Sequence, residues 1–135
     1  MMTFEGACHC GAIGFAYRTQ VRPGEWNLRA CQCSFCRTHA TLTTSDPGGS
    51  LEFFERDAGA MNRYRFGQRT ADFLLCRHCG VYVGAVIDSV CGRFGIVNVN
   101  ALRCRPIELP AVNSSFPAPH AFVGTAVLLV EKRGN

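Results

Sequence analysis

Seven of the nine cysteines in this chain fall into three short clusters, and this clustering constrains the fold more than any other feature of the sequence. The clusters are Cys8-His9-Cys10, Cys31-Gln32-Cys33-Ser34-Phe35-Cys36 and Cys76-Arg77-His78-Cys79. Two cysteines so close together can chelate one metal ion without rearranging the rest of the chain. Zinc takes four such ligands in a closed structural site, and three plus an open position in a catalytic site. Seven cysteines therefore predict one zinc site of each kind.

Length and composition favour a single domain. At 135 residues the chain has the usual size of one domain, so we expect residues 1–135 to fold together. The apolar fraction of 47% is sufficient for a hydrophobic core. No apolar run follows a basic stretch at the N-terminus, and the longest apolar segment, 121–130, is shorter than the roughly 20 residues that a membrane span needs. We therefore expect a cytoplasmic protein without a membrane partner, in which reduced thiols favour metal binding over disulfides.

The formal charge of +4 does not predict a nucleic-acid partner. If seven thiolates hold two Zn²⁺ ions, the charge falls to about +1, and little of the basic balance remains. Thirteen of the basic residues are arginines, and Lys132 is the single lysine. Two explanations for this bias stay open. One is genome base composition, and the other is recognition of carboxylates, with which guanidinium groups pair bidentately.

Short alternating and β-branched segments predict a mainly β structure. We expect one short helical turn after Cys33 and a tight turn over 46–49, where Asp-Pro-Gly-Gly stands. A hairpin is expected to join 62–66 to 70–75. Further strands are expected over 13–17, 26–30, 40–44, 51–55, 81–87, 94–99 and 122–130.

The two outer cysteine pairs look like the two halves of one closed zinc site. A glycine follows each pair, Gly11 after Cys10 and Gly80 after Cys79, and glycine allows the sharp turn that directs amides toward thiolates. We therefore pair Cys8 and Cys10 with Cys76 and Cys79. The alternative is that they are ordinary buried cysteines or disulfides.

The central cysteines leave three possibilities open. Cys31, Cys33 and Cys36 can hold zinc with water in the fourth position, which makes an open Lewis-acid site. His39 has a spacing that also suits a fourth ligand, which would close the site. An internal disulfide after loss of metal is the third possibility.

The remaining cysteines and two histidines lie outside these ligand sets. We expect Cys91 and Cys104 to be small buried apolar residues. His9 and His78 are expected to point outward, or to tune the neighbouring thiolates by hydrogen bonding.

Taken together, Gly6-Ala7-Cys8-His9-Cys10-Gly11, the central run from Cys31 to Arg37, and Cys76-Arg77-His78-Cys79-Gly80 resemble the glutathione-dependent formaldehyde-activating enzyme family, which includes centromere protein V. The resemblance covers about residues 4 to 100. It implies a mainly β, tent-like fold of packed antiparallel sheets pinned by zinc, as in zinc-containing Rab exchange factors. It also implies a structural zinc on the outer four cysteines, and a labile, catalytic zinc on Cys31, Cys33 and Cys36.

The activity that this resemblance implies is that of a carbon–sulfur lyase. Glutathione and formaldehyde would combine to S-hydroxymethylglutathione, with Arg37 as the first candidate to hold a glutathione carboxylate and Arg77 as a weaker one. Two readings stand against it: a non-catalytic two-zinc module that binds protein partners, and a redox or metal-buffering protein that releases zinc on oxidation.

Overall fold

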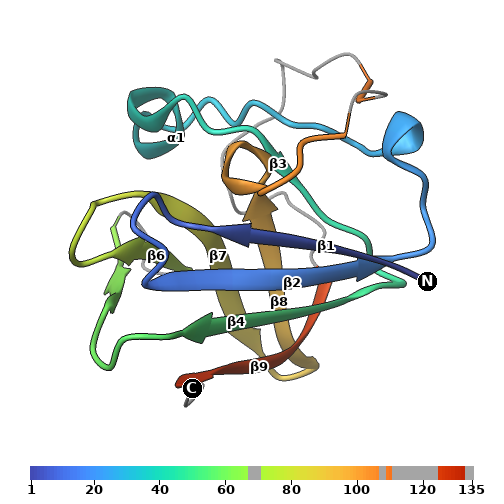
Figure 1. The fold of residues 1–135 in the computed structure, drawn as a ribbon. Coiled ribbons are helices and arrows are strands. Elements are labelled where there is room, and N and C mark those ends of the chain that lie inside the picture. The colour runs from blue at the N-terminus through green and yellow to red at the C-terminus, as the bar shows by residue number, and fades with distance from the viewer. Residues whose placement is uncertain (67–70, 107–108, 111–124, 133–135) are drawn as a thin grey trace.

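Strands make up most of the regular structure, which confirms the predicted mainly β fold class. The computed structural model describes residues 1–66, 71–106, 109–110 and 125–132. Within these ranges nine strands form one connected sheet in the order β1-β2-β4-β9-β8-β7-β6-β5, with β3 paired to β8 off this path (Figure 1). The strands are β1 Met2–Ala7, β2 Ile13–Thr19, β3 Thr43–Thr44, β4 Ser50–Glu55, β5 Met61–Tyr64, β6 Asp72–Cys76, β7 Tyr82–Ser89, β8 Gly92–Asn98 and β9 Thr125–Lys132.

One strand pair departs from the antiparallel arrangement that the resemblance implies. β9 fills the place between β4 and β8, where it runs antiparallel to β8 and parallel to β4. The sheet is therefore mixed. The other strand pairs of the described chain are antiparallel, including the predicted hairpin of β5 and β6.

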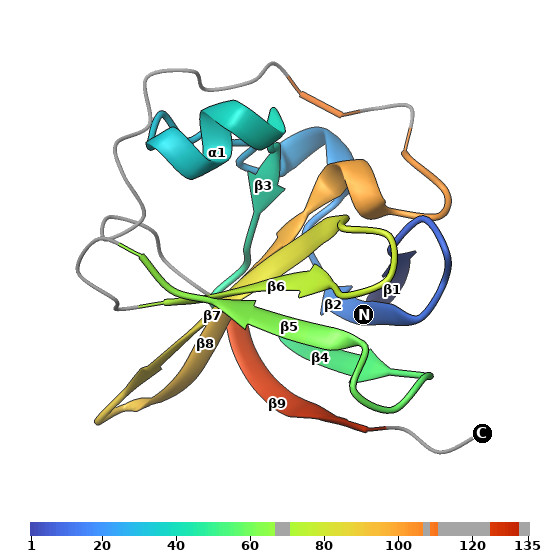
Figure 2. The same cartoon turned by 90° about the vertical axis from the view of Figure 1, so that its left-hand side faces the viewer.

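The main core lies where the sheet folds back on itself, so that β2 and β4 pack across β7 and β8 (Figures 1 and 2). Phe15 on β2 and Phe53 on β4 are fully buried and meet edge to face, with ring centroids 6.1 Å apart. The Phe53 ring packs over Gly84 of β7, where a Cβ atom would lie within 2.7 Å of that ring. This close contact holds the two halves of the sheet together.

A second, smaller core lies between the helix α1 (Ser34–His39) and the sheet (Figure 2). Phe35 of α1 packs against Phe73 of β6 and Tyr82 of β7, with centroid distances of 4.6 and 5.1 Å. Cys31 and Cys36 are buried in the same cluster. The helix thereby fixes the central cysteines against the sheet.

The helical elements are short. α1 is the predicted turn after Cys33, and it ends at Ala40, whose φ of 51° is left-handed. The 3₁₀ turns are η1 Pro23–Glu25 and η2 Val99–Ala101. Within the described ranges, no helix has the length and apolar character that crossing a membrane requires.

Two of the predicted strands are wrong in extent. The segment 26–30 forms no strand and contributes a single bridge, Arg29 to Thr43, while the strand predicted over 40–44 is reduced to β3. Side chains replace the ladder here: Trp26 Nε1 donates to Val21 O at 3.0 Å, and Arg29 Nη2 donates to Ser45 Oγ at 2.7 Å. These side-chain bonds hold an irregular backbone that alternation alone misassigned.

The other predicted elements are confirmed within one to three residues at each end. The turn over 46–49 is closed by Asp46, which accepts from the amides of Gly48 through Oδ1 and of Gly49 through its carbonyl. Thr70 of the predicted hairpin and residues 122–124 of the last predicted strand lie outside the described residues.

Candidate metal centres

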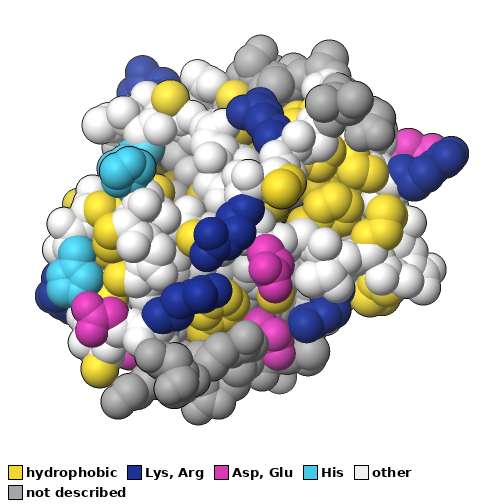
Figure 3. Space-filling model, viewed as in Figure 1, with side chains coloured by type: hydrophobic (Ala, Val, Ile, Leu, Met, Phe, Trp, Pro, Cys, Tyr) yellow, Lys and Arg dark blue, Asp and Glu magenta, His cyan; other side chains and the backbone are white. Residues whose placement is uncertain are grey.

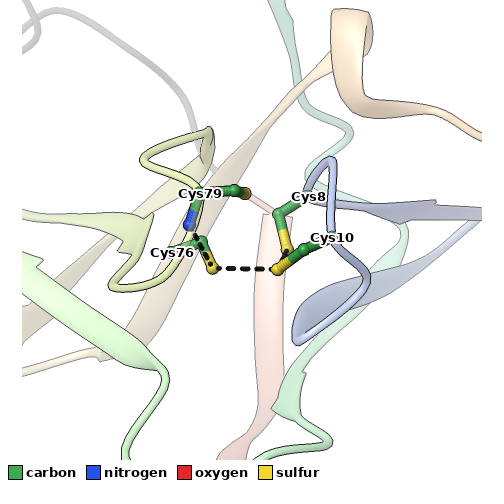
Figure 4. A group of neighbouring side chains, drawn as sticks. All are labelled: Cys8, Cys10, Cys76 and Cys79. Carbon is green, nitrogen blue, oxygen red and sulfur yellow. Dashed lines mark hydrogen bonds between the residues drawn. The ribbon is translucent and has the colours of Figure 1, made fainter.

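The outer cysteine pairs meet in space, as predicted. Cys8 and Cys10 lie in the loop between β1 and β2, while Cys76 ends β6 and Cys79 lies in the turn from β6 to β7. Their four Sγ atoms lie within 4.8 Å of one another. We call these four residues the four-cysteine cluster. Figure 4 shows the two pairs facing each other from opposite loops.

Both loops of the four-cysteine cluster have the same local construction. Each returns through a left-handed glycine, Gly11 with φ +84° and Gly80 with φ +80°. Gly11 N donates to Cys8 O at 3.1 Å, and Gly80 N donates to Cys76 O at 2.9 Å. The predicted role of the two glycines is therefore confirmed.

Backbone amides in these loops are aimed at the sulfur atoms. Ile13 N donates to Cys8 Sγ at 3.4 Å, and the amides of His78 and Cys79 donate to Cys76 Sγ at 3.3 and 3.4 Å. Hydrogen bonds of this kind stabilise thiolates rather than thiols. The loops are thus built to hold negative charge.

Crowding opposes ionisation of all four thiols together. Burial raises the pKa of Cys79, but amide hydrogen bonds from Cys10 and Val81 outweigh it and lower the value to about 6. The Ala12 amide lowers the pKa of Cys10, yet contact with the neighbouring thiols and burial raise it to about 12. A divalent cation among the sulfurs removes this conflict, because it favours every thiolate at once.

The sulfur spacing fits zinc. A tetrahedral ion with Zn–S bonds of about 2.3 Å separates its sulfur ligands by roughly 3.8 Å. The Cys8 and Cys10 sulfurs are 3.7 Å apart, and those of Cys10 and Cys76 are 3.6 Å apart. The donor set and its spacing therefore suit a closed four-sulfur metal site.

The central cysteines form a second group, with Sγ atoms again within 4.8 Å of one another. We call Cys31, Cys33 and Cys36 the three-cysteine cluster. Cys33 caps α1, since its Sγ accepts from Cys36 N at 3.4 Å and its carbonyl accepts from Arg37 N at 3.0 Å. Cys31 and Cys36 are buried and Cys33 is partly exposed. The cluster is therefore reached from the Cys33 side.

The surroundings of the three-cysteine cluster are apolar, with one buried cation. Burial raises the pKa of both Cys31 and Cys36. Arg29 is only 2% exposed, and burial lowers its pKa, a fall that neighbouring Tyr17 and Cys31 offset in part. The guanidinium thus offers positive charge next to the buried thiols.

His39 does not join the sulfur atoms in the structure. It is exposed at the end of α1, where Nδ1 lies 3.2 Å from Phe35 O and the ring packs on Phe35 at 4.2 Å. Among the described residues, the possible metal ligands gathered at this place are the three cysteines.

A pocket of about 530 Å³ lies along α1. Its aromatic wall consists of Phe35, Tyr64 and Phe66, and the Phe35 and Phe66 rings are stacked with centroids 5.5 Å apart. Cys33 and Phe66 both pack against the small core under α1. The lining residues come from α1, β5 and the segments next to them, and the three cysteines are not among them.

The two candidate arginines differ in their contacts. Arg37 is exposed on α1, directly after the last cysteine of the three-cysteine cluster. Arg77 Nε donates to Gly59 O at 2.9 Å, so Arg77 supports the loop of the four-cysteine cluster. Of the two, Arg37 is better placed to contact a small molecule bound at the three-cysteine cluster.

The expectation for the isolated cysteines is wrong. Cys91 and Cys104 are both exposed. Cys91 lies in the turn between β7 and β8, where its amide donates to Ser89 Oγ at 3.2 Å. Position in a turn overrides the usual preference of cysteine for burial.

The histidines beside the outer pairs point outward, as expected. His78 Nε2 lies 2.9 Å from Asp57 Oδ2, and both side chains are at least half exposed.

Basic and acidic side chains are interspersed on the face of the molecule seen in Figure 3.

Two buried groups beside the three-cysteine cluster were missed by sequence reasoning: Arg29 and Tyr82. The alternation over 81–87 places Tyr82 on one face of its strand, but it does not indicate which element covers that face. The short spacing of the cysteines could not supply that information either.

Comparisons with known proteins agree with this geometry. A family model described as "Glutathione-dependent formaldehyde-activating enzyme" matches residues 3–116. A crystal structure of a Rhodobacter sphaeroides protein, determined by structural genomics, is 27% identical with a TM-score of 0.57, and the match covers 81% of this chain and 99% of that one. No curated protein matches the sequence.

Proposed function

The chain belongs to the family of glutathione-dependent formaldehyde-activating enzymes, and from this membership we propose that it is a zinc-dependent carbon–sulfur lyase. It adds a thiol such as glutathione to a small aldehyde such as formaldehyde, or removes it again. The proposed unit is one zinc-binding domain over residues 1–135, working in the cytoplasm where thiols stay reduced.

The observation that carries this proposal is the difference in ligand number between the two clusters. Four sulfurs complete a closed zinc site, whereas three leave one position for a substrate. The four-cysteine cluster is therefore assigned a structural zinc, and the three-cysteine cluster a labile, catalytic one. A zinc ion in the second cluster supplies a Lewis acid that favours ionisation of an incoming thiol.

The reaction balances without another reactant. The thiol sulfur bonds to the carbonyl carbon, the C=O π bond breaks, and the thiol proton passes to the carbonyl oxygen. A free thiol with a pKa of about 8.5 is only partly ionised at neutral pH, so supplying thiolate is the first contribution of the site. Holding thiolate and aldehyde together is the second.

The protein's own residues bind, orient and balance charge. Cys31, Cys33 and Cys36 hold the metal, and the buried Arg29 offsets the excess negative charge of three thiolates around one divalent ion. The exposed Arg37 holds a carboxylate of glutathione. The substrate is placed in the pocket along α1, which is lined in part by Ser34, the neighbour of Cys33 in the sequence.

The Cys33→Ser variant tests the proposal, because serine keeps the N-cap of α1 and removes only the thiolate. We expect two zinc equivalents in the wild-type protein and one in C33S, with the fold retained. The wild-type protein should form S-hydroxymethylglutathione from glutathione and formaldehyde faster than the spontaneous reaction, and C33S should lose this acceleration. NMR exchange spectroscopy measures the rate. Cys91→Ser, at an exposed cysteine outside both clusters, is the matched control and should keep two equivalents and full activity.

Two results would overturn the proposal. One is a wild-type protein that holds two equivalents of zinc yet does not accelerate the reaction, which would favour a binding or metal-buffering role. The other is a C33S variant that keeps both zinc ions and full activity.

A further inference from the structure

The hydroxyl of Tyr82 is buried beside the three-cysteine cluster. The side chain is 2% exposed, and its ring packs edge to face against Phe35 at 5.1 Å and beside Phe73 at 5.9 Å. The Tyr82 carbonyl accepts from Asn98 Nδ2 at 2.9 Å, which fixes the residue at the start of β7. Ring and backbone therefore hold the side chain in the small core that also buries Cys31 and Cys36.

This hydroxyl has no hydrogen-bond partner within the part of the chain that the structure describes. Tyrosine hydroxyls in protein interiors usually find a partner, because burying the group without one is unfavourable. Packing alone would be served as well by phenylalanine at this position. An unpaired buried hydroxyl beside a candidate metal site therefore needs an explanation.

The residues buried with Tyr82 indicate the partner of its hydroxyl, because Cys31 and Cys36 belong to the same small core. Burial raises the pKa of Tyr82 well above its ordinary value, and all three sulfurs of the three-cysteine cluster raise it further, Cys36 most strongly. The opposing neighbour is Arg29, whose guanidinium only donates hydrogen bonds. Among these groups, the possible acceptors are thiolates.

We propose that the Tyr82 hydroxyl donates a hydrogen bond to a buried thiolate of the three-cysteine cluster, Cys31 or Cys36, when the sulfurs close around a metal ion. The inference rests on the proposed function, since it assumes that this cluster binds metal. Tyr82 is a positioning residue in this role, because it acts on the metal through a ligand. An O–H···S bond withdraws electron density from the sulfur, so it favours the thiolate and leaves the metal more electrophilic.

The Tyr82→Phe variant removes the hydroxyl and keeps the ring. Groups that hydrogen-bond to metal ligands typically contribute 10- to 100-fold to metal affinity. We therefore expect the second zinc equivalent of Y82F to bind about 10- to 100-fold more weakly in a chelator competition, while the first equivalent is unchanged. In the cobalt-substituted protein, the thiolate-to-cobalt charge-transfer band of the second equivalent should move to lower energy, because the sulfur becomes more electron-rich.

Tyr17→Phe is the matched control. Its hydroxyl is equally buried and likewise has no hydrogen-bond partner in the described chain, but its ring packs in the main core against Trp26 at 5.6 Å. Y17F should bind both zinc equivalents with wild-type affinity. It should also leave the cobalt spectrum unchanged.

The outcomes separate this inference from the proposed function. A wild-type protein that binds no second equivalent overturns both. A wild-type protein that binds it, together with a Y82F variant of equal affinity and an unmoved cobalt band, overturns the role of Tyr82 alone. An equal loss of affinity in Y17F would also overturn it, because the effect would then belong to any buried hydroxyl.

Discussion

The two cysteine clusters use the same ligand chemistry but join the chain in different ways. The four-cysteine cluster connects the β1–β2 loop to the β6–β7 turn, and its Cys10 and Cys76 are 66 positions apart. The three-cysteine cluster draws its ligands from residues 31–36 alone. Closing a long loop removes much of the conformational freedom of the unfolded chain, whereas closing a short one removes little. The comparison teaches that sequence separation between ligands, as well as their number, sets how much a metal supports the fold.

The two clusters also differ in the groups that surround their sulfur atoms. Amides of Ile13, His78 and Cys79 are directed at the sulfurs of the four-cysteine cluster. The three-cysteine cluster instead relies on the helix α1 and on the aromatic packing of Phe35. We therefore expect the first region to depend on a metal for its shape, and the second to keep its shape through packing even when a metal leaves it.

The largest loss of stability is expected from Cys76→Ser, which removes a sulfur of the four-cysteine cluster. Cys76 is 3% exposed, and its sulfur accepts hydrogen bonds from the amides of His78 and Cys79. Structural zinc contributes about 10–16 kcal/mol of apparent binding energy in small peptides, coupled to folding. We expect C76S to lose most of the roughly 5–15 kcal/mol that stabilises a typical domain. Thermal unfolding by circular dichroism, alongside C33S, measures this.

C33S should melt within a few degrees of the wild type, since the packing of α1 remains. The comparison fails if C76S and C33S are equally destabilised, because the two metals would then support the fold to the same extent.

A smaller effect is expected from Asp72→Asn in the packed region. Asp72 on β6 accepts from Arg63 Nη1 at 3.2 Å and from Arg65 Nε. Burial raises the pKa of Asp72, but these two arginines outweigh it and hold the pKa below its ordinary value of 3.8. The carboxylate therefore stabilises the fold above that value, and this contribution is lost as the pH falls through the depressed pKa.

D72N should cost about 1–2 kcal/mol at neutral pH, at the low end for charged hydrogen bonds because both arginines are nearly half exposed. Urea unfolding from pH 7 down to about pH 2 measures this, and the wild type and D72N should converge at the acid end. Asp88→Asn removes an exposed ion pair with Arg93 and should cost less than about 0.5 kcal/mol. Equal losses in D72N and D88N would contradict a special role for the ion pairs around Asp72.

The smallest effect on stability is expected from Arg37→Ala. This variant tests instead whether the three-cysteine cluster has a substrate-binding residue beside it. Arg37 is exposed, so the melting temperature should not change. Loss of a carboxylate contact of about 1 kcal/mol should raise KM for glutathione about fivefold, with kcat nearly unchanged. Arg22→Ala, at another exposed arginine, is the control. An unchanged KM in R37A would exclude Arg37 from glutathione binding.

The local parts of this structure could be predicted from the sequence. Chelating spacing and the two following glycines predicted the partners of the four-cysteine cluster, because each loop is determined by a few consecutive residues. The helix after Cys33 and the strands β2, β4, β7 and β8 follow from equally local patterns.

The parts that failed depend on contacts between distant segments. The parallel pairing of β4 with β9 and the irregular path over 26–30 are set by tertiary neighbours, which alternation does not reveal. The position of Tyr82 under α1 belongs to the same class, since Phe35 reaches it from a segment 47 positions earlier in the sequence. The exposure of Cys91 has a different cause: it lies in a turn between Ser89 and Gly92, and this position outweighs the average tendency of cysteine to be buried.

The place of β9 in the sheet has a consequence for the order of events during biosynthesis. β9 lies between β4 and β8, yet it begins only at Thr125. A ribosome delivers all seven clustered cysteines long before it delivers the strand that joins the two halves of the sheet. The nascent chain therefore carries all seven clustered thiols while the two halves of the sheet are still unjoined, and the halves can join through β9 only after that strand has emerged.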